Sequence, residues 1–349
     1  MPNSKRVLGD RNGGADDVAS TSREDHDEFA VIERLRRRFA PVGETRLADG
    51  DLGIGDDAAL VSLPSNPVVI ATDLVVEGVH VDLDISGPAD VGWKSVMVTV
   101  SDLGAMGAQV HALLLSVVVP HGFPIDDLAD GVAQAAEVAG GPVVGGDLSS
   151  GERLVVSVTA MGSLGAPMDL PALRRDGARP GDLLVVTGPL GASAAGLRLA
   201  RAGFSAGNAL ASAEAELRAP EAAAVAAHRR PVARLAEGEV ARRFGVHAAI
   251  DISDGLVADA VHLAEASGVG IDLVVDESVV APAATRDEAL GGGEDYELLL
   301  ATSDLAGLTE ALTSAGLRSP IVVGRCSPDA QRRTLDGGHL PKAGWRHHI

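Results

Sequence analysis

Six short acidic motifs, each following a hydrophobic run, constrain the fold of this 349-residue chain more than any other feature. They are GDDAA at 55–59, ATD at 71–73, SD at 101–102, GGD at 145–147, DISDG at 251–255 and GGEDYE at 292–297. One acidic turn is ordinary, since Asp and Gly are both turn formers. Six such clusters would repel one another if they met without cations between them. We therefore expect a fold that gathers them around Mg²⁺ and the phosphates of a substrate.

The composition restricts the partners and the compartment. The net charge of −20 opposes binding to nucleic acid or to an anionic membrane, because both are negatively charged. The single cysteine, Cys326, excludes an internal disulfide framework and a cysteine-based zinc or iron–sulfur cluster. The sequence has no apolar stretch long enough to span a bilayer, and its polar N-terminus differs from a signal peptide. We expect a cytoplasmic protein without nucleic-acid or membrane partners.

The length favours two domains, since a single core seldom keeps growing at 349 residues. Residues 1–27 are polar and lack apolar periodicity, so we expect a disordered N-terminal extension. A first α/β domain is predicted over 28–167, beginning with an amphipathic helix at 28–39. Its strands are predicted at 68–73, 111–119, 142–147 and 153–162, and its other helices at 90–107 and 126–139.

A second α/β domain is predicted over 168–349, beginning with a connection at 168–182 that is rich in Pro, Gly and charge. Residues 191–243 are dominated by Ala, Leu, Glu and Arg, which predicts helices with breaks at Gly203–Gly207, Pro220 and Pro231. Strands are predicted at 247–252, 270–275, 296–301 and 320–324. The expected fold class is α/β, of the α+β type, in two domains.

The acidic motifs suit phosphoryl transfer assisted by metal ions. Mg²⁺ is usually held by one or two carboxylates, waters and substrate phosphates, so seven or eight convergent carboxylates predict more than one ion. The Walker A pattern is absent from the sequence, which has only three lysines, Lys5, Lys94 and Lys342. The H-R-D and D-F-G signatures of protein kinases are absent as well. These absences exclude a P-loop kinase and a protein kinase.

The motifs together resemble the thiamine-monophosphate kinase family, within the superfamily of aminoimidazole ribonucleotide synthetase. The resemblance runs from about residue 28 to the C-terminus and rests on GIGDDAAL at 53–60, ATDLVVEGVH at 71–80, K-x₆-SDLGAMGA at 94–108, GGD at 145–147, GARPGDLLVVTGPLGAS at 177–193, AIDISDGL at 249–256 and GGEDYELLL at 292–300. It implies a two-domain fold of the aminoimidazole ribonucleotide synthetase type, a homodimer built through a barrel of N-terminal strands, and an ATP site between the domains.

The resemblance also implies a reaction and the residues that serve it. ATP would donate its γ-phosphoryl group to thiamine monophosphate by direct in-line transfer, with several Mg²⁺ ions and no base or nucleophile from the protein. The positions that match the family's magnesium ligands are Asp57, Thr72, Asp73, Asp102, Asp147, Asp251 and Asp254. Those that match nucleotide contacts are Gly146, Asp147, Arg175 and Ser253, and those that match acceptor contacts are His80, Glu294 and Trp345. Asp73, Asp102 and Asp147 would hold the ions that assist transfer.

Several alternatives stay open. Asp56 could cap the turn that follows it, and His80 and Trp345 could be ordinary packing residues. Lys94 could pair with a carboxylate or reach a phosphate, and the sequence favours neither role. A sister ATP-using synthetase, or a protein that only binds thiamine phosphate or nucleotide, would carry similar motifs. The lack of cysteine in the N-terminal glycine-rich region and at the C-terminus argues against selenophosphate synthetase and the hydrogenase-maturation relative.

Overall fold

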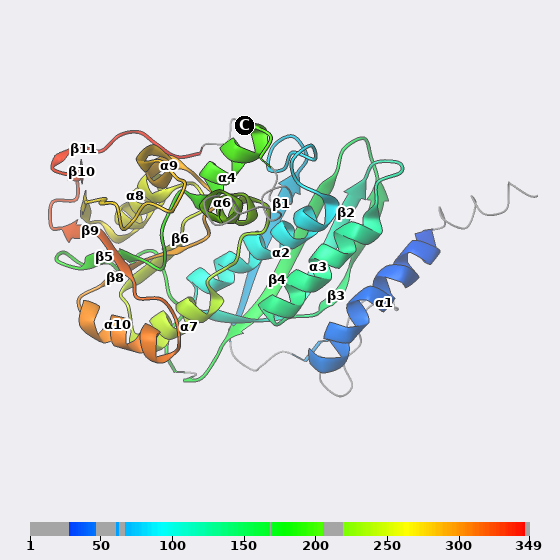
Figure 1. Cartoon of the computed structure of the whole chain (residues 1–349). Helices are drawn as coiled ribbons and strands as arrows, with labels where there is room; N and C mark the ends of the chain where they lie inside the picture. Colours follow the sequence, from blue (N-terminus) through cyan, green and yellow to red (C-terminus); the bar gives the residue numbers. More distant parts are fainter. Residues whose placement is uncertain (1–27, 47–60, 63–66, 168, 205–218, 346–349) are drawn as a thin grey trace, which may run out of the picture.

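The structure, a computed structural model, describes residues 28–46, 61–62, 67–167, 169–204 and 219–345. These residues form two lobes, each built around its own β-sheet (Figure 1). The mixed α/β architecture confirms the predicted fold class. The predicted extension at 1–27 and the GDDAA motif with Asp57 lie outside the described residues.

The first lobe contains a four-stranded sheet in the order β1-β4-β2-β3. Its strands are β1 (Val68–Val76), β2 (Ala108–Val119), β3 (Val143–Ser150) and β4 (Val155–Leu164). Strand β4 pairs antiparallel with β1 and β2, whereas β2 and β3 run parallel because helix α3 (Ile125–Ala139) connects them as a crossover. Among the described strands, β1 and β3 are therefore the two edges of this sheet.

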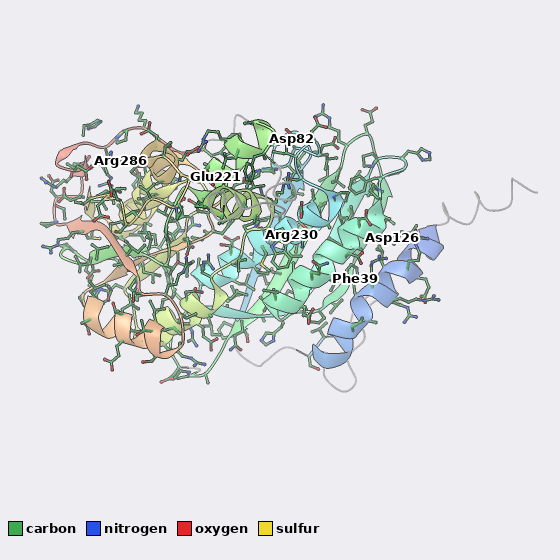
Figure 2. The ribbon with its side chains drawn as sticks, in the orientation of Figure 1. Phe39, Asp82, Asp126, Glu221, Arg230 and Arg286 are labelled. Atoms are coloured by element: carbon green, nitrogen blue, oxygen red, sulfur yellow. The ribbon has the colours of Figure 1, made fainter. Side chains whose placement is uncertain are left out.

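Helices α2 (Pro88–Ala105) and α3 cover one face of this sheet, and α1 (Glu28–Arg46) packs on α3 (Figure 1). The α1 contact has an apolar and an ionic part. Phe39 is 4% exposed, and the Arg38 guanidinium donates to the carboxylates of Asp126, at 3.1 Å, and Asp130. Figure 2 labels Phe39 on α1 and Asp126 on α3. Helix α1 continues seven residues past its predicted end at residue 39.

Two glycines let α2 and α3 cross at backbone contact. A Cβ atom on Gly131 would lie 1.8 Å from the carbonyl oxygen of Ala89, and one on Gly92 would lie 2.0 Å from that of Leu128. Both positions therefore require glycine, although each lies inside a helix where alanine has the higher intrinsic propensity. The close crossing keeps α2 on the sheet, and α2 also carries residues of the site described below.

Replacing Gly131 with alanine is expected to destabilise the protein by about 1–3 kcal/mol, because the helices must separate to admit the methyl group. Urea unfolding followed by circular dichroism measures the change. Gly87→Ala is the matched control, since a Cβ atom there would meet nothing closer than 3.8 Å. Equal stability of the two variants would contradict the packing argument.

The second lobe contains a seven-stranded sheet in the order β11-β10-β7-β9-β5-β8-β6. The strands are β5 (Leu183–Val186), β6 (Ala248–Asp251), β7 (Gly270–Leu273), β8 (Leu298–Thr302), β9 (Ile321–Ser327), β10 (Arg333–Leu335) and β11 (Gly338–His339). Its helices are α4 (Ala192–Arg201), α6 (Ala219–Arg229), α7 (Leu235–Phe244), α8 (Leu256–Ser267), α9 (Arg286–Gly291) and α10 (Leu305–Ser314). The described part of the chain contains no helix long and apolar enough to cross a membrane.

The central strands of this sheet are buried on both faces. On β8, Leu299 packs with α8 and α9, whereas Leu298 and Leu300 pack with α7 and α10. Both sets of side chains are fully buried, so the strand is a continuous apolar run rather than an alternating one. The same apolar run explains why the sequence predicted this strand.

The break predicted at Pro220 falls at the start of α6, which begins at Ala219 and accepts a proline in its first turn without losing a hydrogen bond. The predicted elements of the second lobe need one correction. Helices α8, α9 and α10 were not predicted. They are short, with 12, 6 and 10 residues, and their apolar positions do not form a long periodic pattern.

The lobes are joined by contacts to α2. Arg230, which directly follows α6, donates to Asp90 at 2.6 Å and lies over the ring of Trp93 at 5.7 Å from its centroid (Figure 2). The backbone of Gly238 on α7 approaches Gly104 so closely that a Cβ atom would lie 1.9 Å from the Gly104 carbonyl oxygen. Helix α2 therefore packs against elements of both lobes.

Candidate active site

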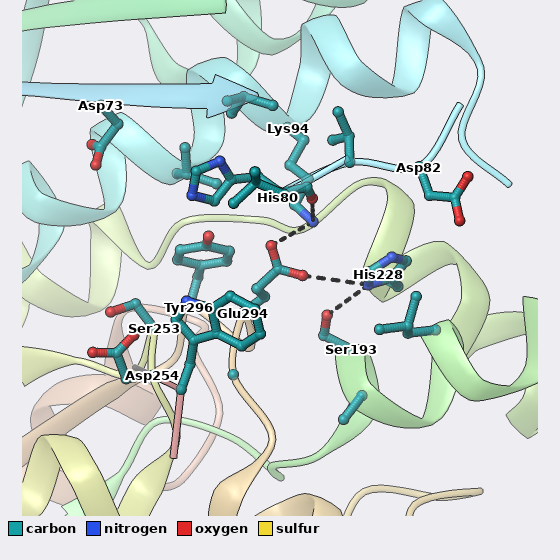
Figure 3. A pocket seen from close by; sticks show the side chains of 18 of the residues that line it. Asp73, His80, Asp82, Lys94, Ser193, His228, Ser253, Asp254, Glu294 and Tyr296 are labelled. Atoms are coloured by element: carbon teal, nitrogen blue, oxygen red, sulfur yellow. Dashed lines mark hydrogen bonds and ion pairs between the residues drawn. The ribbon is translucent and has the colours of Figure 1, made fainter. Parts of the chain in front are cut away.

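A cavity of about 870 Å³ lies where the two lobes meet. From the first lobe it is lined by β1, the segment 77–84 and α2. From the second lobe it is lined by α4, His228, residues of the 251–254 and 292–296 segments, and Trp345 (Figure 3). Acidic motifs that are distant in sequence converge here because α2 contacts both β1 and β6.

Three carboxylates on the cavity wall come from different elements and form an acidic cluster: Asp73 on β1, Asp102 on α2 and Asp251 on β6. Burial, with the neighbouring charges of Asp251 and Asp73, raises the pKa of Asp102 to about 7 against the opposing charge of Arg175. Burial also raises the pKa values of Asp73 and Asp251. The three acids therefore disfavour one another's ionisation until a cation or a proton compensates them.

The acidic cluster has the donor chemistry of a magnesium site. The Oδ2 atom of Asp73 is buried and accepts no hydrogen bond from the described residues, which is costly for a carboxylate. Ser101 Oγ donates to Asp251 Oδ2 at 2.8 Å and orients that carboxylate. Within the described ranges, no three His, Cys, Asp or Glu side chains are spaced as a ready-made metal shell. Phosphate oxygens and waters would have to complete the shell, as is usual for Mg²⁺.

A single carboxylate orients the backbone of the DISDG motif at the cavity. Asp259, in the first turn of α8, accepts hydrogen bonds at its Oδ2 from the backbone N–H groups of Ser253, Asp254 and Gly255, at 3.1, 3.0 and 3.1 Å. Gly255 has a φ of +114°, which favours glycine. Asp259 is buried and therefore fixes the direction of the segment that carries Ser253 and Asp254 on the cavity wall.

The GGEDYE motif forms a strained loop on the second-lobe side. Glu294 and Tyr296 have positive φ values, +67° and +51°, which are rare for residues other than glycine and concentrate at functional sites. Backbone N–H groups of both residues donate to the carbonyls of Ser253 and Ile252, at 2.8 and 2.9 Å. Asp295 accepts from the N–H groups of Gly191 and Ser193 at the start of α4, so it ties this loop to the helix.

The side chain of Glu294 lies between the lobes. One oxygen is 2.6 Å from Lys94 Nζ on α2, and the other is 3.5 Å from His228 Nδ1 on α6 (Figure 3). His80 and Trp345 share the same cavity. The ring Nδ1 of His80 accepts the N–H of Val76 at 3.1 Å, and the Trp345 side chain is 53% exposed at the mouth.

Two family models match the chain in succession: the AIR synthase related protein, N-terminal domain, over residues 55–164, and its C-terminal domain over residues 179–333. The thiamine-monophosphate kinase of Mycobacterium tuberculosis (strain ATCC 25618 / H37Rv) is 40% identical over 290 residues, which cover 78% of this chain and 79% of that protein. The chain belongs to the thiamine-monophosphate kinase family.

Solved structures of thiamine-monophosphate kinases share the fold. The enzyme from Stenotrophomonas maltophilia K279a matches with a TM-score of 0.75 at 35% identity, over 90% of this chain and 98% of that one. A structure described as AaThiL complexed with AMPPCP and TMP matches with a TM-score of 0.67 at 31% identity, over 93% and 98%. The two-domain fold implied by the motifs is thereby confirmed.

The structure brings together many of the residues that the resemblance to thiamine-monophosphate kinases singled out. The cavity wall includes Asp73, His80, Asp102, Asp251, Ser253, Asp254, Glu294 and Trp345. Their individual roles stay predictions. Arg175 is exposed and is not among the described residues that line the cavity, but its charge acts on Asp102 and Asp251.

Thr72, Gly146 and Asp147 are not among the described residues that line the cavity. Thr72 points to the opposite face of β1 from Asp73, where its Oγ1 lies 3.0 Å from Thr159 Oγ1. Asp147 is exposed on β3, the far edge of the sheet from β1, about 14 Å away at three interstrand spacings. Gly146 lies so close to β2 that a Cβ atom would meet the Leu115 carbonyl oxygen at 1.7 Å.

Sequence reasoning missed several residues that the structure places at the site. His228, Ser193 and Tyr296 line the cavity. Asp259 accepts the backbone N–H of Asp254, which lies on the cavity wall. Tyr296 and Asp259 lie within or beside motifs of the thiamine-monophosphate kinase family, so their position was a usable signal. His228 and Ser193 are ordinary helix residues in the sequence, and only the packing of α4 against α6 brings them here.

Proposed function

We propose that this protein transfers the γ-phosphoryl group of ATP to thiamine monophosphate, forming thiamine diphosphate and ADP. The observation that carries the proposal is the cavity itself, which is lined both by the partly buried acidic cluster and by the Glu294 carboxylate. The cluster suits polyphosphate bound with cations, and Glu294 suits a cationic organic group. Two further features support the proposal: family membership, and a relative whose structure holds AMPPCP and TMP.

Asp73, Asp102 and Asp251, with Asp254 nearby on the wall, would hold Mg²⁺. When bound, the ions supply charge neutralisation for the reacting phosphates. The protein's own contribution is to keep these carboxylates in place: Ser101 orients Asp251, and Asp259 orients the segment that carries Asp254. The acceptor phosphate is already ionised at neutral pH, so no side chain is needed as a strong base.

The acceptor would lie with its cationic thiazolium toward Glu294 and its rings against Trp345. A carboxylate favours a cation in a partly buried cavity, and an exposed indole offers a face for cation–π contact. His80 is held in a tight turn, where Val76 N–H donates to its ring, so its position is defined before a ligand binds. Thiamine without a phosphate would satisfy these contacts but would present no phosphate for transfer.

We further propose that the protein is a homodimer. The face of the first sheet opposite α2 and α3 carries apolar side chains that remain exposed on β1: Val68, Ile70 and Leu74, at 37, 64 and 57%. None of the described helices covers this face, and an exposed apolar sheet face of this kind favours association. Asp147 projects from this same face, since the strand register pairs it through Ser116 and Ser157 with Leu74, so a second copy packed there would lie next to it.

The deciding experiment incubates the purified protein with ATP, Mg²⁺ and thiamine monophosphate and measures thiamine diphosphate by chromatography, with thiamine as a parallel acceptor. We expect product from the monophosphate alone. Product from neither acceptor, with Mg²⁺-dependent ATP binding retained, would instead favour a sister synthetase. Binding of the monophosphate without any turnover would favour the non-catalytic alternative.

Magnesium is expected to raise the thermal midpoint of the cation-free protein by roughly 3–6 °C at saturation, because a ligand that binds only the folded state stabilises it. Differential scanning fluorimetry in EDTA and then in excess Mg²⁺ measures the shift, with potassium chloride of equal ionic strength as the control. Asp102→Asn should reduce the shift to less than half. An unchanged shift in that variant would remove Asp102 from the site.

A further inference from the structure

Lys94 is a buried cation at the junction of the lobes. It lies on α2 with 3% of its surface exposed, and its Nζ is 2.6 Å from Oε1 of Glu294 in the second lobe. The same Nζ donates to the backbone carbonyl of His80 at 3.5 Å. One ammonium group therefore touches both residues that the proposed function places around the acceptor (Figure 3).

The other oxygen of Glu294 faces a neutral group. His228 Nδ1 lies 3.5 Å from Oε2 of Glu294 and 3.1 Å from Oγ of Ser193. Burial, and then the charge of Lys94, lowers the pKa of His228 to about 3, so its ring is uncharged at neutral pH. Of these two side chains, Lys94 is the charged partner of the Glu294 carboxylate and His228 is the neutral one.

We propose that Lys94 is a positioning residue for the acceptor: its ammonium group holds the Glu294 carboxylate and the turn at His80 in the geometry that receives the organic cation, and it is not a ligand of the phosphates. Glu294 has a strained backbone, with a φ of +67°, and Lys94 Nζ lies 2.6 Å from its carboxylate. Moving Nζ to a phosphate would leave a partly buried carboxylate without its cation, which is strongly unfavourable. This inference rests on the proposed function.

The test measures binding and kinetics separately. We expect Lys94→Met to raise the dissociation constant and the KM for thiamine monophosphate at least 10-fold, with the KM for ATP changed less than 2-fold. Calorimetry with thiamine monophosphate and Mg²⁺ gives the first quantity without turnover. Lys342→Met, the same substitution at an exposed lysine, should leave all three values unchanged.

A double-mutant cycle with Glu294→Gln identifies the mechanism. If Lys94 acts through Glu294, the double variant Lys94→Met/Glu294→Gln should bind thiamine monophosphate as weakly as Glu294→Gln alone, and no weaker. This comparison also holds if Lys94→Met by itself fails to fold, because the double variant removes both buried charges. Multiplicative losses in the cycle, or an equal rise in the KM for ATP, would overturn the proposal and make Lys94 a phosphate ligand.

The outcomes separate the two proposals. Wild-type protein that binds thiamine monophosphate but transfers no phosphoryl group would contradict the proposed function, while the binding cycle still tests Lys94. Wild-type turnover with normal acceptor binding in Lys94→Met would contradict only the positioning role.

Discussion

Asp73→Asn is expected to lower the rate of thiamine diphosphate formation by about 10³-fold or more, equivalent to about 4 kcal/mol of transition-state stabilisation. Asp73 carries the buried Oδ2 atom that has no hydrogen-bond partner among the described residues, and it lies in the acidic cluster with Asp102 and Asp251. An amide in its place keeps the size of the side chain but removes the charge. Steady-state kinetics at saturating ATP and Mg²⁺ measure the loss.

The same variant should remain folded and, without Mg²⁺, should be at least as stable as the wild type. Removing one of three mutually repelling carboxylates relieves a cost that the cation-free site carries. Thermal unfolding in EDTA measures this. Asp127→Asn, the same substitution at an exposed position on α3, should leave the rate unchanged. A wild-type rate for Asp73→Asn would contradict the assignment of Asp73 to the metal site.

The second large effect concerns Asp147. We expect Asp147→Asn to be as inactive as Asp73→Asn, yet a mixture of the two inactive variants, unfolded and refolded together, should recover about one quarter of the wild-type activity. Asp147 and Asp73 lie on opposite edges of the four-stranded sheet and project from opposite faces, so they cannot meet in one chain. A site that uses both must combine Asp73 of one copy with Asp147 of another.

The quarter follows from the arithmetic of mixing. Half of the dimers in an equal mixture pair the two variants, and each such dimer has one site with both aspartates intact and one with neither, which leaves about one quarter of all sites active. Each variant refolded alone is the control and should stay inactive. Refolded mixtures with no recovery would place both aspartates in sites formed by single chains, or would exclude Asp147 from the site.

Long runs of β-branched and aliphatic residues allowed the strands of the first lobe to be predicted. The predicted 111–119 strand is β2, which begins three residues earlier and ends at the same residue. The predicted 153–162 strand is β4, displaced by two residues at each end. Prediction failed for α8, whose sequence LVADAVHLAEAS is apolar enough for a buried strand and short enough for either element. Its start is fixed by Asp259, whose carboxylate accepts the N–H groups that precede the helix.

The candidate site was predictable in its chemistry but only partly in its membership. Asp73, Asp102 and Asp251 were recognisable because each belongs to a short acidic motif, and the structure brings them to one cavity. Asp147 belongs to an equally clear motif and lies elsewhere in this chain. A motif shows which donor atoms are present in the sequence. The order and register of the strands decide which of these atoms lie on the same face of the sheet.

The amino-acid sequence alone determined the family, the fold class and the acidic character of the site, because these depend on local residue types and their order along the chain. Tertiary structure decided which groups meet. Lys94 and Glu294 come from different lobes, and their 2.6 Å contact exists only because α2 packs against both sheets. Burial then set the charge states, raising the pKa of Asp102 and lowering that of His228, since low-dielectric surroundings penalise whichever form is ionised.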